Sequence, residues 1–143
     1  MSNLRSISSK VLDTLTMYLE QAELGGIVTR KHLNMDPYNA TFNNFPAIWI
    51  GRGAESYEYE TSQNVIVTLD VIVIAFIKNS ISPEQAIDDL VCAIDNHLQR
   101  NLTIDSIAIE IKAASVGEPD YFDNKASVTM HYTVKYEYEA GER

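Results

Sequence analysis

Residues 127–138 alternate strictly between two kinds of side chain, and this period of two limits the fold more than any other feature of the sequence. The apolar and aromatic positions are Val128, Met130, Tyr132, Val134, Tyr136 and Tyr138. The polar positions between them are Thr129, His131, Thr133, Lys135 and Glu137. Because successive side chains of a strand point to opposite faces, the pattern predicts an antiparallel strand with one face in a core and the other in solvent or against a partner.

A second long strand is predicted at residues 65–77, which read VIVTLDVIVIAFI. The run is too short to cross a membrane as a helix, which needs about 20 residues, so we expect a core strand and no membrane partner. Asp70 lies in the middle of this run. Since an unpaired buried carboxylate costs several kcal/mol, we expect Asp70 either to be paired or to lie on a wet or interfacial face.

Shorter strands are expected elsewhere, from alternation and from flanking turn residues. They are an edge strand at 27–30 and strands at 45–50, 55–60 and 106–112. Gly51-Arg52-Gly53 predicts a turn between the second and third of these, and a loop with Gly117 and Pro119 is expected before residue 127. The polar stretch 31–44 predicts a long surface loop.

Two helices are predicted from apolar stripes at helical spacing. The first covers residues 3–23, with Ser2 or Asn3 as its cap and Gly25-Gly26 at its end. The second begins at Ser82-Pro83, where serine can cap and proline suits the first turn. Its stripe comprises Ile87, Leu90, Val91, Ile94 and Leu98, and the side expected to face away carries Asp88, Asp89, Asp95 and Asn96.

These elements predict an α+β fold in the order α-β-β-β-α-β-β, in which a mostly antiparallel sheet of four to six strands packs against two α-helices. A chain of 143 residues has the usual length of one domain and can bury about two thirds of its unfolded surface. We therefore expect residues 1–143 to form a single domain.

The charge balance of the sequence limits the kinds of partner that the chain can bind. Twenty acidic residues against eleven basic ones give a formal charge of −9, which argues against a protein that wraps nucleic acid with clustered lysine and arginine. The start of the sequence, MSNLRSISSKVLD, contains no apolar stretch of signal-peptide length. The one cysteine, Cys92, cannot form an internal disulfide, so we expect the chain to be made and to assemble in the cytoplasm.

No catalytic residue, cofactor site or metal site is predicted. His32, His97 and His131 fall in different elements without metal-ligand spacing, and Cys92 has neither a second cysteine nor an identifiable base. The glycines around Arg52 do not form a phosphate-binding motif. The acids of the GEPDYFDN segment lack the spacing of a calcium loop. We expect a protein that is not an enzyme.

The GEPDYFDN segment is instead a candidate assembly interface, because it joins an aromatic pair to acidic residues. Exposed aromatic side chains in loops are typical anchors between proteins, whereas most tyrosines on the predicted strands are expected to pack in the core. The candidate interface residues are Tyr121, Phe122, Asp120, Glu118, Arg52 and Asp70.

The order of these segments resembles the tail-terminator and tail-completion proteins of long-tailed bacteriophages, the minor tail protein U-like family. The resemblance spans residues 4–138 and is carried by the first helix, FPAIWIGRG, ESYEYETSQNVIVTLDVIVIAFIK, SPEQAIDDLVCAIDNHL and the final TMHYTVKYEYE. The resemblance rests on the order of the elements and on the residue types within them, since the family has no signature motif whose residues could be transferred. Neck and head-completion proteins of the same particles share much of this element order and residue pattern.

The resemblance implies a structural protein of the virion that forms a ring, hexameric in this family. Such a ring ends the growth of the tail tube and joins the tail to the head or neck. The implied partners are further copies of the chain, the tail-tube protein and a neck or head-completion protein, with DNA passing through the ring without specific binding. Two alternatives remain open: another neck or head-completion connector, or a small-ligand-binding domain.

Overall fold

The computed structural model describes residues 6–22, 24, 27–29, 46–78, 81–99, 110–122 and 124–139. The helices in this part of the chain are α1 (Ile7–Gln21) and α2 (Pro83–Gln99). The strands are β1 (Ile27–Thr29), β2 (Ala47–Tyr59), β3 (Asn64–Lys78), β4 (Glu110–Val116), β5 (Asp120–Phe122) and β6 (Lys125–Glu139). The α+β class and the predicted element order are confirmed, with β5 as one additional short strand.

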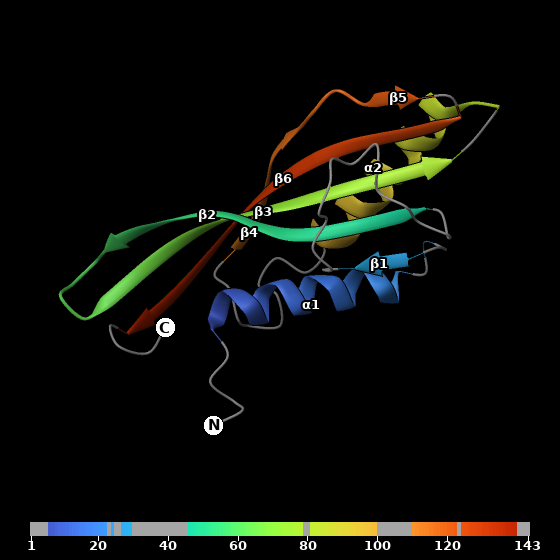
Figure 1. The fold of residues 1–143 in the computed structure, drawn as a ribbon. Coiled ribbons are helices and arrows are strands. Elements are labelled where there is room, and N and C mark those ends of the chain that lie inside the picture. Colours follow the sequence, from blue (N-terminus) through green and yellow to red (C-terminus); the bar gives the residue numbers. More distant parts are fainter. Residues whose placement is uncertain are drawn as a thin grey trace.

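The strands form one sheet in the order β1-β2-β3-β6-β4, and β5 also pairs with β6 (Figure 1). Among the described strands, only β1 and β2 pair in parallel. The two long strands predicted from the sequence, β3 and β6, pair along their whole length, from Asn64 opposite Glu139 to Lys78 opposite Lys125. They form the centre of the sheet.

The hydrophobic core lies between one face of the sheet and the two helices. Every second residue of β3 is buried from Val65 to Val73, and every second residue of β6 from Ala126 to Tyr136. These side chains form one cluster with the buried residues of both helices, among them Leu15 of α1 and Ile94 of α2. We call this the helix side of the sheet and the opposite one the open face, whose β3 residues from Ile66 to Ile74 are partly exposed.

The prediction of a turn at Gly51-Arg52-Gly53 is wrong, because β2 runs through it without interruption. The two glycines serve close packing instead. A Cβ atom on Gly51 would overlap the indole ring of Trp49, and one on Gly53 would overlap the carboxylate of Asp70. The strand keeps its pairing with β3 throughout, apart from a β-bulge between Arg52 and Glu55 that inserts one extra residue.

The helix ends agree with the predictions only in part. The start of α2 at Pro83 is confirmed, whereas α1 is capped by Ser6, whose Oγ accepts a hydrogen bond of 3.2 Å from the backbone N–H of Ser9. The caps predicted at Ser2 or Asn3 and the helix end at residues 25–26 lie outside the described residues, as do the loop at 31–44 and the first part of the strand predicted at 106–112. That strand extends further than predicted, to Val116.

The strand tyrosines divide into two groups. Tyr132 and Tyr136 are buried, as predicted for core residues, but Tyr57 and Tyr59 are 43% and 66% exposed. Tyr57 and Tyr136 are both opposite Val67, so the difference follows from position across the sheet: β6 is a central strand, whereas no described strand lies on the outer side of β2 at Tyr57 and Tyr59. The ends of β2, β3 and β6 extend beyond both helices in Figure 1. We call this projection, residues 55–59, 64–69 and 134–139, the arm.

Candidate assembly interface

The acidic aromatic segment around Tyr121 is partly a strand rather than the loop predicted from the sequence. Asp120 and Tyr121 lie in β5 and pair with Ser127 and Ala126 at the start of β6. This stretch of β6 precedes the residues that β4 pairs with, so its edge is available to a short third strand. Glu118 and Asp120 are exposed, and the Tyr121 side chain is 48% exposed. Phe122 ends β5, and its side chain lies outside the described part of the chain.

The surroundings of Tyr121 are acidic beyond its own segment. Partial desolvation, followed by the negative charges of Glu84 and Asp88 on α2, raises the pKa of the Tyr121 hydroxyl. The tyrosine therefore lies within electrostatic reach of the first turns of α2. We call the acidic residues Glu84, Asp88, Glu118 and Asp120, together with Tyr121, the β5 patch.

Asp70 lies on the open face, where its carboxylate is paired, as one alternative predicted, and is also partly exposed to solvent. Its carboxylate oxygens lie 3.2 and 3.3 Å from Nδ1 of His131, and both side chains are 37% exposed. His131 belongs to β6, so the contact crosses between the two central strands. The pair therefore stabilises the carboxylate on a face that remains accessible to solvent or to a partner.

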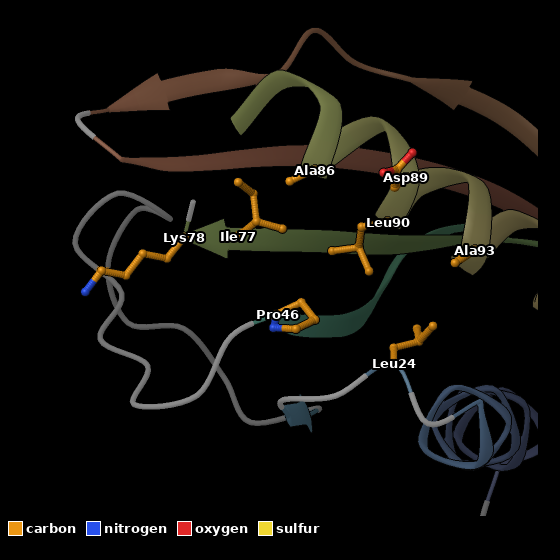
Figure 2. Close-up of a pocket in the computed structure, with 8 residues that line it drawn as sticks. All are labelled: Leu24, Pro46, Ile77, Lys78, Ala86, Asp89, Leu90 and Ala93. Carbon is orange, nitrogen blue, oxygen red and sulfur yellow. The ribbon is translucent and has the colours of Figure 1, made fainter. Parts of the chain in front are cut away.

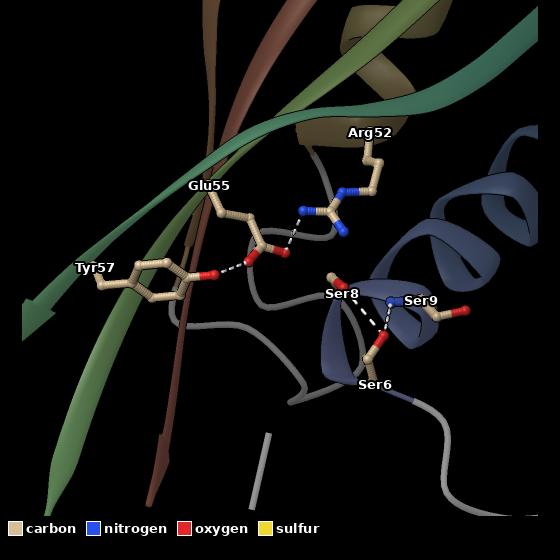
Figure 3. A network of polar contacts seen from close by, with 6 residues as sticks. All are labelled: Ser6, Ser8, Ser9, Arg52, Glu55 and Tyr57. Atoms are coloured by element: carbon tan, nitrogen blue, oxygen red, sulfur yellow. Dashed lines mark hydrogen bonds and ion pairs between the residues drawn. The ribbon is translucent and has the colours of Figure 1, made fainter. Parts of the chain in front are cut away.

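Arg52 lies on the helix side, in a polar network at the root of the arm (Figure 3). Its Nη2 is 2.9 Å from Oε1 of Glu55, and the hydroxyl of Tyr57 donates a hydrogen bond of 2.6 Å to the other carboxylate oxygen. The Glu55 side chain is only 3% exposed, so both contacts compensate a largely buried charge. Sequence reasoning missed this network, because the three side chains share a face only if the bulge is present.

The structure does not bring the predicted interface residues together into one site. Arg52 and Asp70 lie on opposite faces of the sheet. Tyr121 pairs with Ala126 and Asp70 with Thr133, so their positions along β6 differ by about 23 Å at the usual rise per residue. They are three separate surface features.

A hollow of about 410 Å³ lies beside α2 (Figure 2). Its lining residues are Leu24, Pro46, Ile77, Lys78, Ala86, Asp89, Leu90 and Ala93. The volume suits a small ligand, but among the described residues that line it only Lys78 and Asp89 carry a charge. Within the described residues no three histidine, cysteine or acidic side chains are placed to hold a metal ion, and none of the helices has the length and hydropathy to cross a membrane.

The sheet has two unlike outer edges. On one side, β1 pairs with β2 only at Ala47, Ile48 and Trp49, so the rest of β2 has no strand beside it among the described residues. On the other side, β4 is the last strand of the described sheet. Both edges present backbone groups that can pair with a strand of another chain.

Comparison with known proteins supplies the context for these surfaces. No curated protein sequence matches the chain. Residues 1–137 match the model of a family described as Bacteriophage Tail Tube Terminator Protein. The match covers nearly the whole chain and agrees with the resemblance found in the order of the sequence segments. The chain therefore belongs to the bacteriophage tail tube terminator family, whose members are structural proteins of the phage tail.

Proposed function

We propose that the chain forms a hexameric ring at the end of the tail tube, stops further addition of tube subunits and offers its other side to a neck or head-completion protein. The observation that carries the proposal is the family match across residues 1–137. The role is one of contact between proteins, with no catalysis and no cofactor. The whole chain acts as a single domain in this proposal.

The two outer edges of the described sheet support a ring. They lie on opposite sides of the sheet and differ in sequence, so a contact between them joins each copy head to tail with the next. Contacts of this kind produce a ring when the rotation between neighbours closes and an open filament when it does not. A closed ring with two different faces stops a tube, since only one face reproduces the surface that the tube extends.

The acidic composition supports a bore through which DNA passes without specific binding. A formal charge of −9 disfavours adhesion of phosphates, which depends on lysine and arginine. We place the assembled ring in the virion, between tail and head, and its assembly in the host cytoplasm.

The first experiment measures the assembly state of the purified chain by light scattering after size exclusion, with negative-stain imaging of the same peak. A ring predicts an apparent mass of about six times that of the chain, as expected for closed cyclic symmetry. Added to polymerising tube protein of the same phage, the protein should shorten the tubes and be found at one end only. A compact monomer without effect on tube length would contradict the proposal.

Removal of the gene separates the terminator from other connectors. We expect overlong tails that fail to join filled heads. Tails of normal length that do not join heads would assign the chain to another neck or head-completion connector. The hollow beside α2 keeps a small-ligand-binding domain as the second candidate, and that role predicts a monomer or dimer whose melting temperature rises when the ligand is present.

A further inference from the structure

The outer edge of the arm has one aromatic and one acidic side. Tyr57 and Tyr59 are opposite Val67 and Val65 and therefore lie on the helix side, whereas Glu58 is opposite Ile66 on the open face. Both tyrosines are largely exposed, and no described strand pairs with this part of β2 on its outer side. The edge is thus open to a strand that brings apolar groups to one face and a positive charge to the other.

The arm as a whole is negatively charged. One basic residue, Lys135, lies within its residues, and the acidic ones are Glu55, Glu58, Glu60 in the adjoining turn, Glu137 and Glu139. Natural edge strands are often protected from pairing by lysine, but here the charge has the opposite sign. A strand carrying lysine or arginine would therefore be attracted to this edge and not repelled from it.

The other free edge of the same chain has the complementary pattern. In β4, Lys112 is opposite Thr133 on the open face and is 71% exposed, while Ile111 and Ala113 are opposite Val134 and Tyr132 on the helix side. The strand therefore alternates apolar, basic and apolar residues. That is the pattern that the edge at Tyr57, Glu58 and Tyr59 requires.

Strand direction and register agree with a contact between these edges. Neighbouring strands are antiparallel from β2 through β3 and β6 to β4, so β4 runs opposite to β2 and can extend the sheet of a second copy in antiparallel fashion. With Lys112 opposite Glu58, Ala113 lies beside Tyr57 and Ile111 beside Tyr59. A slip of one residue would move Lys112 to the aromatic side, and a slip of two could place Glu110 opposite Glu58.

We propose that β4 of one copy adds to the arm edge of β2 in the next copy, with Lys112 opposite Glu58, and that this pairing joins neighbouring subunits. The inference rests on the proposed ring and names the surfaces that form it. The partner is a second copy of this chain, because the chain itself carries the complementary strand on the opposite side of its sheet. The pairing continues the open face and the helix side from one subunit to the next.

Exchange of the two charges tests the pairing. Glu58→Lys and Lys112→Glu should each weaken ring assembly about two- to fivefold per interface, as expected for an exposed ion pair, and the effect should decrease at high salt. The double variant should restore assembly. Glu20→Lys on the exposed surface of α1 makes the same change in net charge as Glu58→Lys and should leave assembly unchanged, and the melting temperature of each variant verifies folding.

Disulfide cross-linking tests the register. In a Cys92→Ser background, Glu58→Cys with Lys112→Cys should give a ladder of covalent oligomers under oxidation, since directly opposite residues of an antiparallel pair bring their Cβ atoms within about 5 Å. Glu58→Cys with Lys125→Cys serves as the control and should give no ladder. Rings of the wild-type chain combined with neither rescue nor ladder would overturn the edge pairing while leaving the ring intact. A wild-type chain that stays monomeric would overturn both the ring and the pairing.

Discussion

The hydroxyl of Tyr132 donates a hydrogen bond of 2.9 Å to Oδ1 of Asp95, and this bond joins the central strand β6 to α2. Tyr132 is 1% exposed, so its hydroxyl has given up contact with water and depends on this acceptor. Asp95 was expected to face away from the core with the other acids of α2. The structure shows instead that Asp95 is partly buried and accepts the hydrogen bond of a core tyrosine.

Replacement of Tyr132 by phenylalanine measures how much the hydrogen bond to Asp95 contributes to the stability of the fold. We expect Tyr132→Phe to lower the free energy of unfolding by about 1 to 2 kcal/mol, because a hydrogen bond to a charged acceptor is lost while Asp95 can still contact water. Chemical denaturation measures the change. Tyr59→Phe removes a hydroxyl from an exposed ring and should change stability by less than about 0.5 kcal/mol; an equal loss in both variants would contradict the assignment.

The same bond predicts a dependence of stability on alkaline pH. Burial, followed by the hydrogen bond and the charge of Asp95, raises the pKa of Tyr132 far above its ordinary value of 10.0. Above pH 10 the unfolded chain loses this proton while the folded chain keeps it, so the unfolded state binds fewer protons and stability falls as the pH rises, by up to about 1.4 kcal/mol per pH unit. Below pH 10 the contribution is fully present.

Denaturation curves at several pH values from 8 upward test this slope. The Tyr132→Phe variant carries no ionisable group at this position, so its stability should fall less steeply above pH 10. Parallel slopes for the two proteins would show that other groups cause the alkaline loss.

Gly51 should not tolerate a larger residue. Its backbone lies under the indole ring of Trp49, and the added methyl group of Gly51→Ala would overlap that ring. We expect a loss of about 1 to 3 kcal/mol, typical of overpacking, measured by thermal or chemical unfolding. The combination with Trp49→Leu should recover part of the loss, whereas an unchanged stability of the single variant would show that the ring moves aside without cost.

The β5 patch should contribute to contacts between proteins more than to folding. Tyr121→Ser replaces a side chain that is 48% exposed, so stability should change by no more than about 0.5 kcal/mol, while attachment to a tail or neck partner weakens. Co-sedimentation with tube or neck protein measures attachment, and a melting curve provides the control. We expect the joint replacement of Tyr121 and Phe122 by serine to act in the same direction, and unfolding of that variant would place the aromatic pair in the core.

The sequence predicts most of the sheet because periodicity reports burial directly. The alternation in β6 and the apolar run of β3 identify the two central strands, and Pro83 marks the start of α2. The exposure of Tyr59 could not be predicted in this way, since an alternating pattern does not show which strand lies at the edge of the sheet. The continuity of β2 was missed for a related reason: pairing with β3 holds Gly51 and Gly53 in a strand, although the same residues in isolation favour a turn.

The bulge between Arg52 and Glu55 decides which side of the arm is aromatic and which is acidic. Before it, Arg52 is opposite Val71, and after it Glu55 is opposite Leu69, so one residue is added to β2 without a counterpart in β3. If the same residues paired with β3 without the bulge, Tyr57 would be opposite Ile66 on the open face and Glu58 opposite Val65 on the helix side. One residue without a counterpart in β3 therefore sets the chemical character of both faces of the arm, whereas its deletion, for instance of Ala54, would leave Glu55 opposite Leu69 and both faces as they are.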